Sequence, residues 1–176
     1  MSTISTTTDA GTSEDPEPHR SWQSWASLVA RLVLGGVLVW SGLSKITALE
    51  TSAEAVRAYQ ILPYDVANVV GYVLPVLELA LGLLLLLGLF TRLSGLAGAV
   101  LMLVFVGGIA SVWARGISID CGCFGGGGTI DPGAATAKYP WEIARDLALA
   151  ACGVWLGLRP DSPVSMDRWL HGGPRR

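Results

Sequence analysis

Long apolar segments alternate with shorter polar connections along most of the chain. Four such segments run over about residues 25–46, 66–90, 93–114 and 141–158. Within them leucine and valine fall in runs instead of alternating with polar residues. About 20 apolar residues, at a rise of 1.5 Å each, cross a hydrocarbon core roughly 30 Å thick. The pattern therefore predicts an all-α fold, an integral membrane four-helix bundle.

Polar segments flank this hydrophobic part at both ends. We expect one transmembrane domain over residues 22–159, with cytoplasmic tails at 1–21 and 160–176. The first tail is acidic, rich in Ser and Thr and free of aromatic residues, a composition typical of disorder. It has no basic region followed by an apolar one, so we expect no cleavable signal peptide, and the first helix should act as the insertion signal.

Composition agrees with a membrane protein and excludes other classes. Hydrophobic residues make up 51% of the chain and charged residues 15%, against about 25% charged in soluble domains. The mean hydropathy is +0.50. A net charge of −2 gives no reason to expect a nucleic-acid partner. Several tryptophans lie near predicted helix ends, where aromatic rings meet lipid headgroups: Trp22, Trp25, Trp40, Trp113, Trp141 and Trp155.

The first polar connection, at residues 47–65, predicts a short amphipathic helix. Thr51 and Glu54 form a capping-box pattern that would start this helix, and Pro63 would end it. Such a helix suits the membrane surface. Its apolar residues share one face: Val56, Tyr59 and Leu62.

The distribution of Lys and Arg near the helix ends predicts the orientation. These residues are more numerous on the side that would hold both termini, and that side is expected to be cytoplasmic. The protein is therefore predicted to be a multi-pass protein of the cell membrane. The short helix and the Gly-rich segment at 115–140 would then face the extracytoplasmic side.

Two of the three cysteines lie one residue apart in this Gly-rich segment. Cys121 and Cys123 belong to the stretch DCGCFGGGG, and Gly122 allows the bend that a disulfide between them needs. So small a ring would be strained, and strained or exposed disulfides exchange readily. The neighbouring Asp120 disfavours a thiolate by like charge. Redox exchange, a static structural disulfide and ordinary loop residues are the alternatives.

No closed metal site is expected within the chain. A structural zinc site needs four ligands, and both histidines, His19 and His171, lie in the predicted tails. Cys152 lies near the middle of the fourth predicted helix, where a cysteine usually serves as a small apolar packing residue.

Ionisable residues inside membrane helices are costly and face the bundle interior, so each is a candidate functional residue. Glu78 lies near the middle of the second predicted helix, and the long side chain of Arg31 in the first can reach its depth. We therefore expect an Arg31–Glu78 ion pair that ties the two helices together. A proton-related or quinone-related role of Glu78 is the alternative.

Further charged residues lie near the outer ends of the predicted helices. Lys45 ends the first helix, and Arg145 and Asp146 lie in the first turns of the fourth. They either shape a vestibule around the Cys loop or, for the two cations, extend to the lipid headgroups.

Motifs in a particular order run through the chain. They are Arg31-x-x-Leu34-Gly35, Ser41-Gly42-Leu43-x-Lys45-Ile46, Tyr59-x-Ile61-Leu62-Pro63, Pro75-x-x-Glu78-x-x-x-Gly82, Arg115-Gly116, Asp120-Cys121-Gly122-Cys123-Phe124-Gly125 and a helix start from Trp141 to Arg145. In this order, over residues 26–158, they resemble the MauE/DoxX family of redox-associated four-helix membrane proteins, and within it the MauE branch.

The resemblance implies a role in the maturation of extracytoplasmic proteins through thiol–disulfide chemistry. In the MauE branch the partner is typically a thioredoxin-like protein, and the named role concerns the small subunit of methylamine dehydrogenase. DoxX relatives imply quinone-coupled oxidation or oxidative-stress membrane complexes. Cys121 and Cys123 match the family's CxC position. Its recurrent polar positions are matched by Arg31, Lys45, Glu78 and Arg145.

We therefore predict that Cys121 and Cys123 cycle between dithiol and disulfide by exchange with a thioredoxin-like extracytoplasmic protein or a client protein. A membrane quinone is a candidate electron acceptor, and no other cofactor is expected. Two other classes stay open: a non-catalytic scaffold for an oxidoreductase complex, and a small-solute transporter with Glu78 as its proton site. The sequence leaves open whether the chain is itself a thiol–disulfide oxidoreductase or an accessory subunit of one.

Overall fold

A computed structural model describes residues 18–122 and 128–159, which are predominantly helical. The helices are α1 (Pro18–Ile46), α2 (Leu49–Ala58), α3 (Tyr64–Leu87), α4 (Thr91–Ala114) and α5 (Pro132–Leu158). Extended pairing within these residues is limited to one isolated bridge between Ile119 and Thr129. The predicted all-α class is confirmed. Of the predicted tails, residues 1–17 and 160–176 lie outside the described part of the chain.

Three of the helices are long and apolar enough to cross a membrane: Trp22–Ile46, Tyr64–Leu87 and Thr91–Ala114. They correspond to the first three predicted spans, with ends displaced by a few residues. The fourth predicted span, 141–158, belongs to α5, which begins at Pro132. Since α5 carries several charged residues in its first half and is not among the three, a fourth membrane span stays a prediction.

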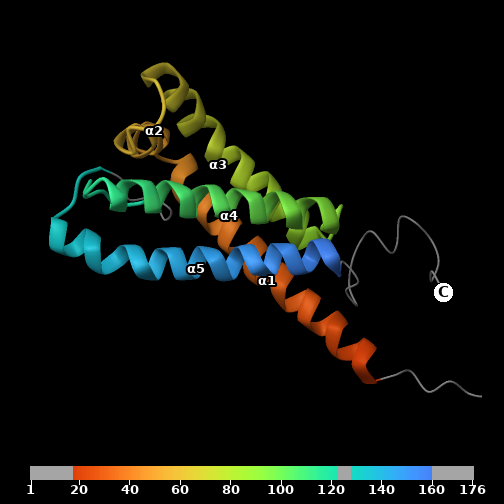
Figure 1. Cartoon of the computed structure of the whole chain (residues 1–176). Coiled ribbons are helices and arrows are strands. Elements are labelled where there is room, and N and C mark those ends of the chain that lie inside the picture. The colour runs from red at the N-terminus through yellow and green to blue at the C-terminus, as the bar shows by residue number, and fades with distance from the viewer. Residues whose placement is uncertain (1–17, 123–127, 160–176) are drawn as a thin grey trace, which may run out of the picture.

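The long helices pack in pairs (Figure 1). α4 and α5 run antiparallel side by side, and α1 passes behind them at an angle in this view. α3 packs mainly against α1, and α2 packs against α3. Buried leucines fill the centre of this arrangement, among them Leu34 and Leu38 of α1, Leu85 of α3 and Leu156 of α5.

Glycines let the paired helices approach closely, as expected where backbones meet in a membrane protein. A Cβ atom on Gly42 of α1 would lie 2.9 Å from the carbonyl oxygen of Pro75 in α3. A Cβ atom on Gly153 of α5 would lie 2.9 Å from Ala99 in α4 and would also press on the carbonyl of Gly95. Both helix pairs therefore depend on the absence of a side chain at their crossing.

The connection between α3 and α4 lies slightly earlier than residues 91–92, which separate the predicted segments 66–90 and 93–114. Gly88 ends α3 with φ of +69°, a conformation that glycine adopts without steric cost. Phe90 precedes α4, and Thr91 already opens that helix. A glycine in the left-handed region therefore ends α3 before the polar residues Thr91 and Arg92 are reached.

The short helix forms where the sequence predicts one, but its start, end and buried face differ. α2 begins at Leu49, and its N-cap residue, Ala48, makes no side-chain capping bond, so the predicted capping box is wrong. It ends at Ala58, well before Pro63, which instead caps α3. The residues that α2 buries are small ones: Ser52, Ala53 and Ala55. Ala53 packs against Gly71 of α3 so closely that a side chain at Gly71 would clash with it, and this contact determines which face of α2 is buried.

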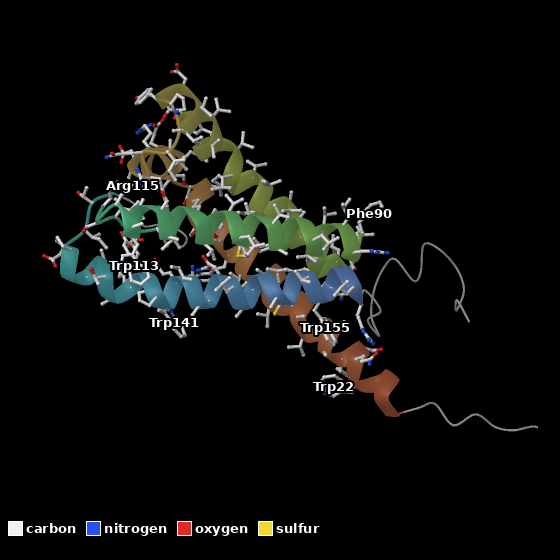
Figure 2. The ribbon with its side chains drawn as sticks, viewed as in Figure 1. Trp22, Phe90, Trp113, Arg115, Trp141 and Trp155 are labelled. Atoms are coloured by element: carbon white, nitrogen blue, oxygen red, sulfur yellow. The ribbon has the colours of Figure 1, made fainter. Side chains whose placement is uncertain are left out.

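Aromatic side chains mark the two ends of the long helices (Figure 2). Trp113 and Trp141 lie at the end where α4 leads into the Cys loop, whereas Trp22, Trp155 and Phe90 lie toward the opposite end. Trp22 and Trp141 are largely exposed, as are most of the large apolar side chains on the outer faces of α1, α3 and α4. This distribution suits helices surrounded by lipid with aromatic rings at the two interfaces.

The close α4–α5 crossing predicts a large effect of one methyl group. Gly153→Ala is expected to lower the free energy of unfolding by about 1–3 kcal/mol, because the new Cβ atom meets backbone that cannot move cheaply. Unfolding of the full chain in detergent, followed by circular dichroism, measures this change. Gly107→Ala in α4 is the control, since nothing lies within 4 Å of its Cβ position. Equal effects of the two substitutions would contradict the crossing.

Candidate functional site

A buried ion pair links α1 to α3. Lys45 Nζ lies 2.7 Å from Glu78 Oε1 and 3.0 Å from Oε2, and the two side chains are 6% and 0% exposed. Ser41 Oγ donates a further hydrogen bond of 3.0 Å to Glu78 Oε2. The ammonium of Lys45 also lies 5.4 Å from the centre of the Phe105 ring. Lys45 thus points into the protein, toward Glu78, and both oxygens of the carboxylate are engaged.

The expected Arg31–Glu78 pair is wrong, since Glu78 is bound by Lys45 and Ser41. Gly42 of α1 lies against Pro75 of α3, so the part of α1 level with Glu78 is the turn around Ser41. Ser41 lies ten residues after Arg31, which is about 15 Å along a helix. Arg31 is buried as well, but in the opposite half of α1. Estimating depth from the helix ends overlooked the place where the two helices cross.

The first half of α5 presents two buried carboxylates, Glu142 and Asp146, one turn apart on the same face. Asp146 is bound by the neighbouring Arg145, with 2.8 Å between Nη2 and Oδ1, and it also interacts with the charge of Lys45. One oxygen of each carboxylate, Oε2 of Glu142 and Oδ2 of Asp146, is buried without a hydrogen-bond partner among the described residues. Arg145 is therefore half of an ion pair that borders this polar interior.

The base of the Cys loop is closed by a short bridge and one tyrosine. The bridge joins Ile119 to Thr129, with backbone hydrogen bonds on both sides of it. Tyr139 of α5 is buried beneath it, and its hydroxyl accepts a hydrogen bond of 2.9 Å from the Ile119 amide. The same hydroxyl lies 2.9 Å from the carbonyl of Ile117 and 3.0 Å from that of Ile119, to either of which it can donate. Both ends of the loop are thus attached to α5.

A second tyrosine attaches the loop to the segment after α2. Tyr59 Oη donates a hydrogen bond of 3.1 Å to the carbonyl oxygen of Cys121. Arg115, which follows α4, donates hydrogen bonds to the carbonyls of Tyr59 and Gln60. Figure 2 places Arg115 at the same end of the molecule as Trp113. Cys121 is therefore held at the meeting point of three segments that are distant in the sequence.

The backbone around Cys121 bends as the sequence predicts. Gly122 has φ of +69°, and its amide donates a hydrogen bond of 3.2 Å to Asp120 Oδ1. The other oxygen of Asp120 lies 3.1 Å from Lys138 Nζ. This hydrogen bond from Lys138 to the Asp120 carboxylate raises the pKa of the lysine above its ordinary value. Cys123 lies outside the described residues, so the predicted Cys121–Cys123 pairing stays a prediction.

Cys121 itself is half-buried and faces α5. Its thiol lies beside the carboxylate of Glu142, a side chain that is only 8% exposed. The thiol sulfur and one carboxylate oxygen each of Asp120 and Glu142 lie within 4.8 Å of one another. Three such atoms come near enough for a metal ion by distance alone, but the described residues contribute no fourth donor of a closed zinc site.

Sequence reasoning missed Glu142, a buried carboxylate that lies beside the Cys121 thiol. The available signal was its spacing of four residues from Asp146, which places both carboxylates on one helix face. Nothing in the sequence states that this face lies under the Cys loop. Cys152, by contrast, packs against the leucine core as expected and lies ten residues beyond Glu142, about 15 Å farther along α5.

Comparisons with known proteins agree with the resemblance seen in the sequence. The chain matches the family described as methylamine utilisation protein MauE over residues 23–159. It is 37% identical over 148 residues to the methylamine utilization protein MauE of Paracoccus denitrificans, covering 81% of this chain and 75% of that protein. No solved structure matches the chain significantly.

The Lys45–Glu78 pair predicts strong coupling between α1 and α3. Glu78→Gln is expected to cost about 3–5 kcal/mol of unfolding free energy, because it leaves a buried ammonium without its counter-ion. Lys45→Met in the same chain should recover part of this loss. A double-mutant cycle from detergent unfolding measures the coupling energy. An Arg31→Met cycle with Glu78→Gln is the control, and coupling there in place of the Lys45 cycle would contradict the assigned pair.

The tyrosine beneath the loop predicts a local effect. Tyr139→Phe removes the acceptor of the Ile119 amide and should destabilise the loop base by about 1–3 kcal/mol. Amide hydrogen exchange at Ile119 should accelerate about tenfold or more. Tyr72→Phe is the matched control, because the bond that the Tyr72 hydroxyl makes among the described residues is to the exposed Glu50. Unchanged exchange in Tyr139→Phe would show that the hydroxyl does not hold the loop.

Proposed function

Because this chain belongs to the family of methylamine utilisation protein MauE, we propose that it supports the maturation of an extracytoplasmic protein by thiol–disulfide exchange through Cys121 and Cys123. Membership of this family, together with three apolar helices, points to a membrane accessory protein of methylamine utilisation. The thiol chemistry and the partner go beyond this and are the content of the proposal.

The observation that carries the proposal is the placement of Cys121. The cysteine is half-buried and lies at one end of the long helices, so a partner can approach it from outside the membrane. Its carbonyl accepts a hydrogen bond from Tyr59, and Gly122 bends the backbone directly after it. A structural cysteine inside the helices, such as Cys152, has none of these features. A cysteine whose backbone is held in place while its side chain is only half-buried suits a thiol that reacts with another protein.

The exchange proceeds in two balanced steps. A thiolate of this chain attacks one sulfur of the partner's disulfide, forms a mixed disulfide and releases the other partner sulfur as a thiolate, which takes up a proton. The second cysteine of this chain then loses its proton and displaces the partner, which leaves as a dithiol. The chain now holds the Cys121–Cys123 disulfide. The reverse sequence oxidises the partner instead.

The partner that fits this chemistry is a thioredoxin-like extracytoplasmic protein or the maturing client itself. Its site must lie on the side of the membrane that holds the Cys loop, and we assign this side to the exterior, with both termini in the cytoplasm. Counted with the C-terminal tail, six Lys and Arg residues lie on the side of the termini and four on the side of the Cys loop, the direction that the positive-inside rule requires. A membrane quinone stays a candidate electron acceptor, and the steps written above do not depend on it.

The surroundings of Glu78 disfavour the alternative of a proton-coupled transporter. Its carboxylate is bound by both Lys45 and Ser41, so a proton would have to displace an ion pair in the protein interior. This arrangement suits a pair that holds α1 to α3. The scaffold alternative makes a different prediction, since it requires neither thiol.

The test is the redox state of the two cysteines in intact cells. A membrane-impermeant thiol reagent, applied with and without mild reductant and followed by mass spectrometry, should label Cys121 and Cys123 only after reduction. Either single variant, Cys121→Ser or Cys123→Ser, should accumulate a mixed disulfide with a thioredoxin-like protein on non-reducing gels. Cys152→Ser is the control and should behave as the parent chain.

Two results would overturn the proposal. Absence of labelling after reduction, in cells where other exterior cysteines react, would place the loop elsewhere. Full maturation of the client with both cysteines replaced by serine would favour the scaffold.

A further inference from the structure

Three carboxylates gather at the end of α5 that carries the Cys loop, but their surroundings differ. Asp120 accepts hydrogen bonds from the amide of Gly122 and from Lys138, which lies 3.1 Å away. Asp146 is bound by Arg145 at 2.8 Å. Glu142 lies in sequence between these two cations, yet it forms no ion pair with any described residue. One of its oxygens lies within 4.8 Å of the thiol sulfur of Cys121.

The burial of Glu142 makes this contact unusual. The side chain is 8% exposed, and its Oε2 atom is buried without a hydrogen-bond partner among the described residues. Leaving a buried carboxylate oxygen unsatisfied is expensive, and such positions recur where a protein uses the group chemically. The Asp120 carboxylate, by comparison, has a partner at each oxygen. Within the described residues Asp146 also has one unpartnered oxygen, but its other oxygen is bound by Arg145. Glu142 is thus the carboxylate at this end that has an unpartnered oxygen and forms no ion pair with a described residue.

The charges explain why the thiol needs such a group. A thiolate at Cys121 would lie within 4.8 Å of one carboxylate oxygen of Asp120 and one of Glu142. Adding a negative charge beside an unprotonated Glu142 is opposed by repulsion in a poorly solvated site. If the proton of the thiol passes to Glu142, the number of negative charges in the site does not change. Ionisation of the cysteine is then coupled to protonation of the neighbouring acid.

We propose that Glu142 is the proton acceptor that activates the Cys121 thiol. The sulfur–hydrogen bond of Cys121 breaks, and its proton forms a bond to the Glu142 carboxylate. The resulting thiolate attacks a disulfide sulfur of the partner, and the displaced partner thiolate takes the proton. In the reverse direction Glu142 protonates Cys121 as it leaves. The inference rests on the proposed function for its biological meaning, but the activation step can be measured without any partner.

The test uses the full chain in detergent, with Cys123→Ser and Cys152→Ser to leave Cys121 as the reporting thiol. An aromatic disulfide is the probe, because its exchange with a thiolate releases a coloured aromatic thiolate. We expect Glu142→Gln to slow this reaction about a hundredfold or more at neutral pH, which is the usual range for loss of a general base. The rate should approach that of the parent only at alkaline pH. The groups that act on Glu142 there are Asp120, Cys121, Lys138 and Arg145.

The sign of the effect separates proton transfer from simple electrostatics. Removing a negative charge beside a thiol favours the thiolate, so a purely electrostatic role of Glu142 predicts a faster reaction in Glu142→Gln. Asp120→Asn is the matched control. It removes a neighbouring charge without removing the proposed acceptor, and its reaction should be as fast as that of the parent or faster. Glu142→Asp keeps a carboxylate and should recover part of the rate.

A reaction of Glu142→Gln that is as fast as that of the parent at every pH would overturn the inference. Slow reaction of all variants, Asp120→Asn included, would do the same, because it would indicate a damaged loop instead of a lost acceptor. The outcome is independent of the cellular test of function. If Glu142→Gln slows the reaction with the aromatic disulfide but the cysteines show no disulfide exchange in cells, the activation of Cys121 by Glu142 is retained and the proposed function is rejected.

Discussion

The buried ion pair between Lys45 and Glu78 is the constraint on which the arrangement of the helices depends. Two opposite charges removed from water are tolerable only when each is the other's partner, and Ser41 satisfies the remaining demand of the carboxylate. This requirement fixes the position of α1 along α3. The close contact at Gly42 lies in the same turn of α1, so the charge pair and the backbone contact specify one register.

That register also determines where the Cys loop can lie. α1 ends one residue after Lys45, and α2 follows directly and packs on α3, which brings Tyr59 toward the end of α4. Arg115 then donates a hydrogen bond to the carbonyl of Tyr59, and the Tyr59 hydroxyl donates one to the carbonyl of Cys121. From the other side Tyr139 of α5 holds the loop base. The polar interior of the helices thus continues into the hydrogen bonds that position the thiol.

The proposed chemistry makes use of a contrast between two kinds of buried carboxylate. The carboxylate of Glu78 is bound by the ammonium of Lys45 and the hydroxyl of Ser41, and these bonds stabilise the contact between α1 and α3. Glu142 is buried beside the Cys121 thiol and forms no ion pair with a described residue, and in the proposed chemistry it exchanges a proton. In a membrane protein of the MauE family, such a division separates the group that holds the fold from the group that serves the reaction.

The sequence by itself determined the helical class, three spans and the bend at Gly122, because hydrophobic runs and glycine conformations are local properties. It also indicated that Glu78 and Lys45 matter, but not that they bind each other. Only the tertiary structure decided that partner, since it depends on where α1 and α3 cross. The same holds for Glu142, whose helix face is readable from spacing, whereas its contact with Cys121 requires a loop folded back over α5. Pairings between distant segments follow from packing geometry, which residue patterns within one helix do not contain.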